Sequence, residues 1–127
     1  MAEIRTYLHV TVPNAIGKLA EATARLKDAG VNLETIIAWG EGPTGHMILG
    51  PSDADTSRRA LGGWATDIDD LDVVVVELPH KVGALELVAS KLAEADIDVT
   101  MVAATTTGES ATVVLSTSDN EEAIQIL

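Results

Sequence analysis

The chain has 127 residues, which allows one domain or two very small ones, and half that length is marginal for an independent core. It has no cysteine, which excludes disulfides and thiolate metal sites and is compatible with a reducing compartment. The formal net charge of −12, with only 2% aromatic residues, argues against nucleic acid and anionic membranes as partners.

The first twenty residues lack the apolar core of a signal peptide, and no apolar run approaches the length of a membrane-spanning helix. We therefore expect a cytoplasmic protein. The charge is uneven: residues 1–66 hold six Lys/Arg and seven Asp/Glu, whereas residues 67–127 hold two and thirteen. Solubility is the simplest explanation of this difference, and a basic partner of the second half is the alternative.

The first half predicts the order β-α-β-β-α from its alternation, helical spacing and turn residues. The predicted elements are a strand over 4–12, a helix over 16–29, a strand over 31–39, a hairpin loop over 40–45, a strand over 46–49 and a helix from Ser52 or Asp53 to about Leu61. Residues 65–71 could add a further strand after the second helix.

The second half predicts the same order. Its elements are a strand over 72–78, a helix over 82–95, a strand over 97–105, a turn over 106–109, a strand over 110–116 and a helix after Ser118. Glu121 follows Ser118 at the spacing of a capping box. The chain stops at Leu127 inside this last helix, so we expect the second copy to lack a final strand.

The two halves are copies of one another at a constant offset. Residues 13–19 (PNAIGKL) recur as residues 79–85 (PHKVGAL), and residues 29–33 (AGVNL) recur as residues 95–99 (ADIDV). Each pair is 66 positions apart, which indicates two structural units of the same kind. We assign residues 1–70 to the first unit and residues 71–127 to the second.

A β-α-β-β-α-β order is typical of the ferredoxin-like fold, an antiparallel sheet with both helices on one face, so we expect the α+β class. Without a last strand, the second unit would leave Val73–Leu78 as a bare edge that contains four consecutive valines. Such an edge is a template for pairing with another chain. We expect a strand of a neighbouring copy or the 65–71 connector to cover it, and a homodimer or larger oligomer.

The repeated residues resemble the ACT domain family, a family of small ligand-binding regulatory modules of amino-acid metabolism. Its signature is a strand, a turn that ends in glycine, and a helix that closes on Ala-Gly-(Val/Ile)-Asn. The first copy has Gly17 followed by residues 28–32 (DAGVN), and the second has Gly83 followed by residues 94–98 (EADID). The resemblance spans nearly the whole chain and implies two ACT-like units in tandem.

The resemblance also implies a site for a free amino acid at a seam between paired domains. The ligand contacts the turn before the first helix and the start of the second strand. The candidate ligand-binding residues are Asn14, Ala15, Ile16, Gly17 and Asn32 in the first copy, and His80, Lys81, Val82, Gly83 and Asp98 in the second. His80 and Asp98 depart from the asparagine pair of the first copy. The family often has proline just before the turn glycine, where this chain has Ile16 and Val82.

Elementary chemistry favours the same residues. A helix N-terminus offers unpaired backbone N–H groups to a carboxylate, and asparagine side-chain oxygens accept hydrogen bonds from an ammonium. The structural alternatives are that the glycines serve only the turn, that Asn14 is an N-cap and that Asn32 is a bend residue. Trp39 and Trp64 are interpreted as packing residues.

No residue pattern predicts catalysis. The three histidines lack metal-ligand spacing, the loop at residues 40–45 lacks the motif of a phosphate-binding loop, and no nucleophile motif occurs. We therefore expect neither an enzyme nor a cofactor or metal. The leading hypothesis is an allosteric regulatory protein that senses a free amino acid and modulates a metabolic enzyme. The alternative is a structural dimerisation or docking module that binds no ligand.

Overall fold

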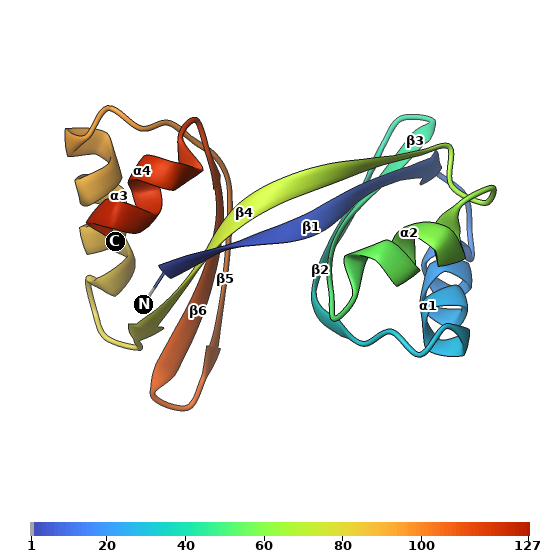
Figure 1. Cartoon of the computed structure of the whole chain (residues 1–127), viewed down its shortest axis with the longest axis horizontal. Helices are drawn as coiled ribbons and strands as arrows, with labels where there is room; N and C mark the ends of the chain where they lie inside the picture. The colour runs from blue at the N-terminus through green and yellow to red at the C-terminus, as the bar shows by residue number, and fades with distance from the viewer. Residues whose placement is uncertain (1) are drawn as a thin grey trace. The chain divides into compact units, whose positions relative to one another are not determined.

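The computed structural model describes residues 2–127 (Figure 1). Within this range the chain forms six strands and four helices. They are β1 (Ala2–Pro13), α1 (Lys18–Asp28), β2 (Leu33–Glu41), β3 (Thr44–Pro51), α2 (Ala54–Leu61), β4 (Asp67–Pro79), α3 (Ala84–Glu94), β5 (Val99–Thr107), β6 (Ser110–Thr117) and α4 (Asn120–Ile126). The strand and helix order predicted from the sequence is confirmed in both halves.

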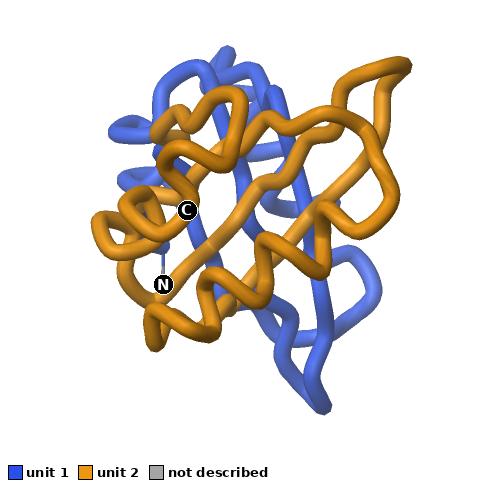
Figure 2. Tube along the Cα trace, turned by 90° about the vertical axis from the view of Figure 1, so that its right-hand side faces the viewer, with its two compact units in different colours: residues 1–5, 72–127 blue, residues 6–71 orange. Residues whose placement is uncertain are grey.

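The chain divides into two compact units (Figure 2). The N-terminal unit, orange in Figure 2, consists of residues 6–71. The C-terminal unit, blue in Figure 2, consists of residues 2–5 together with residues 72–127. The boundary therefore differs from the predicted division at residues 70 and 71, because the start of β1 belongs with the second half of the chain.

The N-terminal unit has the strand order β2-β3-β1-β4. β1 pairs antiparallel with β3, so that Leu8 lies opposite Leu49, and β2 pairs antiparallel with β3. Its core contains Leu8 and Leu49 from the sheet with Leu26 from α1 and Leu61 from α2. Both helices cover one face of the sheet, as the ferredoxin-like pattern predicts (Figure 1).

The C-terminal unit repeats this arrangement with the strand order β1-β4-β6-β5. β4 pairs antiparallel with β6, so that Val76 lies opposite Val113. Its core joins these strands to Val88 and Leu92 of α3 and to Ala123 of α4. The unit therefore has four strands rather than three.

The start of β1 supplies the strand that the sequence appeared to lack. β1 lies next to β4 in the strand order, and Ala2 and Ile4 pack against the core of the C-terminal unit. The expectation that the second unit lacks its last strand is thus wrong. So is the expectation that residues 65–71 or a neighbouring copy covers Val73–Leu78. β1 has 12 residues and β4 has 13, about twice the usual length of a strand, so each can serve both units.

Asp53 and Asp119 cap the second helix of each half. Thr56 N–H donates to Asp53 Oδ1 and Glu122 N–H donates to Asp119 Oδ1, each at 3.0 Å. Ser118 is therefore not the cap that its spacing from Glu121 predicted. Ser52 and Ser118 instead accept hydrogen bonds from the backbone N–H groups of Asn32 and Asp98.

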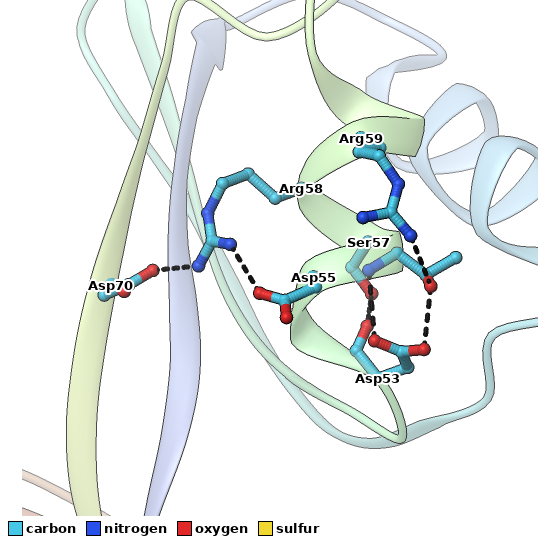
Figure 3. A network of polar contacts seen from close by, with 7 residues as sticks. Asp53, Asp55, Ser57, Arg58, Arg59 and Asp70 are labelled. Carbon is cyan, nitrogen blue, oxygen red and sulfur yellow. Dashed lines mark hydrogen bonds and ion pairs between the residues drawn. The ribbon is translucent and has the colours of Figure 1, made fainter.

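A polar network ties α2 to the sheet of the N-terminal unit (Figure 3). The Arg58 guanidinium donates to Asp55 on its own helix and to Asp70 on β4. These hydrogen bonds, that to Asp70 above all, raise the pKa of Arg58. The network therefore links residues 67–71 of β4 to the helix that precedes them.

Candidate ligand-binding site

The two glycine turns have the same unusual backbone. Gly17 has φ 90° and Gly83 has φ 85°, a left-handed conformation in which a residue with a Cβ is strained. The residue before each glycine is turned fully outward, because Ile16 is 104% exposed and Val82 is 107% exposed. The glycines are therefore needed for the turn itself, and this role leaves the turn open to a ligand.

The helices after these turns begin without a side-chain cap. Gly17 is the N-cap of α1 and Gly83 is the N-cap of α3, and neither helix has a side-chain cap hydrogen bond. The N-termini of α2 and α4, in contrast, are capped by aspartates. The N–H groups of Lys18 and Ala84 donate to Ala15 O and Lys81 O, so the N–H groups that follow them in each first turn are the ones that remain for an anion or for water.

Asn14 lies against the β2–β3 hairpin rather than on α1. Its backbone N–H donates to Pro43 O at 2.9 Å, and its side-chain Nδ2 donates to Gly42 O at 3.0 Å. A Cβ built on Gly40 would come within 2.6 Å of Nδ2, so the amide lies where only glycine leaves room. The interpretation of Asn14 as an N-cap is therefore wrong, and Oδ1 is the acceptor that this side chain can offer a ligand.

Asn14 lines a pocket of about 220 Å³ in the N-terminal unit. Ala15 and Lys18 line it from the turn and the start of α1, and Trp39 and His46 line it from β2 and β3. Ile16 and Gly17 complete the turn beside it. The pocket thus joins the glycine turn to the hairpin end of the sheet.

Asn32 lies at the other end of β2. It lines a separate pocket of about 390 Å³ with Lys27, Gly30 and Leu33, among others. Ser52 fixes its backbone, because Ser52 N–H donates to Asn32 O at 2.8 Å and Asn32 N–H donates to the Ser52 hydroxyl at 3.0 Å. Among residues 2–127 no hydrogen bond joins the Asn32 side chain, which is exposed.

The two asparagines are not brought together within the unit. Asn32 directly precedes β2, whereas Asn14 contacts Gly40 and Gly42 at its far end. A strand of this length separates them by roughly 25 Å, at about 3.3 Å for each residue. A free amino acid cannot span that distance, so a ligand that contacts both asparagines needs a second copy of the chain.

The C-terminal unit has the same arrangement with other residues. His80 N–H donates to Glu109 O at 2.7 Å near the β5–β6 hairpin, and Asp98 lies at the far end of β5 beside Ser118. Lys81, Val82 and Gly83 line a pocket of about 300 Å³ against α3. His80 and Asp98 are therefore also apart, and they give this unit a different set of polar groups.

Two clusters of side chains were not predicted from the sequence. His9 Nε2 lies 3.0 Å from His46 Nδ1, and the Trp39 ring stacks on His46 at 5.0 Å between ring centroids. The Trp64 ring lies 5.5 Å from Lys18 Nζ and 5.5 Å from the Arg25 guanidinium carbon, both on α1. In the sheet register, His46 on β3 lies opposite Trp39 on β2 and opposite Thr11 on β1, two residues from His9. This register brings the first cluster together, and it was not known from the sequence.

Within residues 2–127, no group of three or more His, Cys, Asp or Glu side chains has the geometry to hold a metal ion. Across the same range, no helix is long and apolar enough to cross a membrane.

No family model and no curated protein matches the sequence. Among solved structures, a protein from Bacteroides thetaiotaomicron superposes with a TM-score of 0.92 at 24% identity, over 99% of this chain and 88% of that one. The regulatory subunit of aspartate kinase from Thermus thermophilus, in a ligand-free form, gives a TM-score of 0.67 at 14% identity, over 98% and 93%. The aspartokinase alpha and beta subunits give 0.65 at 21% identity, over 91% and 86%.

These superpositions establish the fold of the chain. The fold is ACT-like, with ferredoxin-like units of mixed α and β structure. The superposition on the aspartate kinase regulatory subunit covers both units of the present chain.

Proposed function

We propose that this chain is a regulatory protein that senses a free amino acid through ACT-like units and modulates a metabolic enzyme. The observation that carries the proposal is the pair of uncapped helices after the glycine turns, in a chain whose other two helices are capped by aspartate. An uncapped N-terminus suits the carboxylate that every free amino acid carries.

The ammonium group would be recognised by asparagine. Oδ1 of Asn14 remains available beside the uncapped turn, and the Asn32 side chain is exposed beside its own pocket. Because these residues lie at opposite ends of β2, the proposed site is shared by two copies of the chain. One copy contributes Asn14 with the turn at Ala15, Ile16 and Gly17, and the other contributes Asn32. This arrangement requires a homodimer or a larger oligomer.

The corresponding positions of the C-terminal unit would bind such a ligand differently. His80 and Lys81 replace Asn14 and Ala15, and Asp98 replaces Asn32. A carboxylate at Asp98 pairs with an ammonium more strongly than an amide does, but it repels the carboxylate of the same ligand. We therefore propose that the asparagine pair forms the principal site.

The regulatory role is supported by the kind of protein that shares the fold. Solved structures that superpose on this chain include regulatory subunits of aspartate kinase, which are regulatory parts rather than catalytic ones. The partner we propose is a metabolic enzyme whose activity this amino-acid sensor changes.

A thermal-shift screen of the twenty amino acids tests the proposal. A ligand present at about 100 times its dissociation constant stabilises the folded state by roughly 2.7 kcal/mol, which raises the melting temperature by several degrees. We expect one amino acid or a few related ones to do so. If none changes the melting temperature at millimolar concentration, the chain is better described as a docking module that binds no ligand.

A further inference from the structure

Two histidines meet on the face of the N-terminal sheet that lies away from α1 and α2. Leu8 and Val10 of β1 and Met47 of β3 belong to the core beneath the helices. Because successive side chains of a strand point to opposite faces, His9 and His46 lie on the other face. There His9 Nε2 and His46 Nδ1 are 3.0 Å apart, although the two residues are separated by 37 positions in the sequence.

The contact determines which nitrogens carry protons. Glu41 Oε1 lies 3.5 Å from His46 Nε2 and favours a proton on that nitrogen, which leaves a lone pair on Nδ1. The hydrogen bond of the pair then runs from His9 Nε2 to His46 Nδ1. Because His9 can carry its proton on Nδ1 instead, both of the facing nitrogens can offer lone pairs to a cation.

The separation of the two nitrogens suits a transition-metal ion. Imidazole nitrogens bind zinc at about 2.0–2.1 Å, so two of them at angles of about 90–110° are roughly 2.9–3.4 Å apart. The 3.0 Å between His9 and His46 falls in this range. A carboxylate on the other nitrogen of a ligating histidine is the usual outer partner in such sites, and Glu41 has this position at His46.

The surroundings hold one ring in place and attract cations. Trp39 stacks on His46, whose side chain is only 17% exposed. On β4, which neighbours β1, Ile68 packs against the core, so Asp67 and Asp69 lie on the same face as His9. Exposed carboxylates on this face raise the local concentration of cations.

The histidine pair is separate from the candidate amino-acid site. The pocket of Asn14 includes Leu19 of α1 and the core residue Met47, so it lies on the helix face of the sheet. His9 and His46 face the opposite side. A ligand of one site therefore does not require the other.

We propose that His9 and His46 bind one divalent transition-metal ion that prefers imidazole, such as Zn²⁺. Nε2 of His9 and Nδ1 of His46 are its two protein ligands, and water fills the remaining positions. The ion takes the place of the proton between the two nitrogens, and Glu41 holds the Nε2 proton of His46. With two protein ligands, the site binds its ion reversibly and does not require the group of three that is absent among residues 2–127.

The test is a titration of the ¹⁵N-labelled full chain with zinc chloride, followed through the imidazole nitrogen shifts. We expect saturable shifts of His9 Nε2 and His46 Nδ1 at about 1 mM Zn²⁺ or below, and no shift of His80. Mg²⁺ prefers oxygen ligands and should leave the histidine shifts unchanged. If Zn²⁺ shifts only carboxylates, or if the histidine shifts do not saturate, the histidines are a hydrogen-bonded pair only and the proposal is overturned.

Variants locate the ion. His9→Gln and His46→Gln should each weaken Zn²⁺ at least about ten-fold, since the loss of a ligand costs no less than the loss of an outer partner. His80→Gln removes a histidine of the C-terminal unit and should leave the affinity unchanged. The amide spectrum of each variant establishes that it is folded. Unchanged Zn²⁺ affinity in either variant of the pair would contradict the site.

The role of Glu41 has its own readout. Glu41→Gln should move the His46 nitrogen shifts toward the other tautomer and weaken Zn²⁺ by about two- to five-fold, less than the usual ten-fold or more because this carboxylate is 77% exposed. Glu109→Gln, in the other hairpin, is the matched control and should change neither quantity. If Glu41→Gln also changed neither, Glu41 would not position His46.

Discussion

At the scale of single residues, the proposed site depends on a contact that holds one amide in place. Asn14 donates through Nδ2 to Gly42 O, and this orients Oδ1 away from that carbonyl. Gly40 makes the contact possible, because a methyl group there would meet Nδ2 at 2.6 Å. In the proposed site, the role of Gly40 is to leave room for the Asn14 amide, and Gly40 itself does not touch the ligand.

We predict that Gly40→Ala weakens amino-acid binding about as much as Asn14→Ala does. The loss of one hydrogen bond to a charged group corresponds to roughly 1.5–3 kcal/mol, a weakening of about ten-fold or more. Calorimetric titration measures both variants, and Thr106→Ala is the control, since Thr106 is the exposed residue at the position of the other hairpin that corresponds to Gly40. The role of Gly40 would be refuted if its variant bound the amino acid as tightly as the unchanged protein.

The sequence predicted the candidate residues but not their separation. The offset of 66 and the two glycine turns were readable because both copies carry them without insertion. The position of Asn14 was misjudged because asparagine before a helix usually caps it, whereas here Gly17 itself occupies the N-cap. The distance from Asn14 to Asn32 follows from the sheet register, which alternation alone does not fix.

At the scale of the elements, α2 and α4 have the side-chain caps that the glycine-turn helices lack. Asp53 accepts from the Thr56 N–H and from the Thr56 hydroxyl. These hydrogen bonds, that from the Thr56 N–H above all, lower the pKa of the Asp53 carboxyl. The folded state therefore binds this proton less readily than the unfolded state does.

The resulting pH dependence has a definite sign. A carboxyl whose pKa is lower in the folded state adds stability above its unfolded pKa of about 3.9 and loses it as the pH falls through the folded value. We predict that Asp53→Asn, which keeps a capping oxygen but not the charge, lowers the melting temperature slightly at pH 7 and reduces its decline below about pH 4, so that variant and parent converge in acid. Asp53→Ala should lower the melting temperature at pH 7. Identical melting curves for both variants and the parent protein at every pH would contradict the cap assignment.

At the scale of the whole molecule, β1 and β4 each contribute residues to both units. Residues 2–5 complete the C-terminal unit, and residues 67–71 complete the N-terminal unit. The sequence predicted that residues 65–71 could add a strand to the first half, but it did not predict that this strand continues into 72–78 or that residues 2–5 complete the second half, because alternation does not state which strand lies beside which. The consequence is that neither half of the chain is a complete unit by itself.

We predict that the C-terminal unit depends on Ile4, which packs against its core. Because Ile4 is only partly buried, Ile4→Ala should lower the free energy of unfolding by about 1–2 kcal/mol, less than the loss at a fully buried site. Glu3→Ala, at the exposed neighbouring position, should change it by no more than about 0.5 kcal/mol. Urea unfolding compares the two, and equal effects would contradict the role of residues 2–5.

The central claim is that two copies of the chain share one amino-acid site, and a mixing experiment tests it most directly. Asn14→Ala and Asn32→Ala should each abolish or strongly weaken binding of the amino acid found by the thermal screen. In a symmetric dimer, an equal mixture of the two variants re-forms one intact site in each mixed dimer, which restores about a quarter of the sites at the original affinity. Calorimetry that shows this partial recovery is the predicted result. A mixture that binds no better than either variant alone would contradict the shared site.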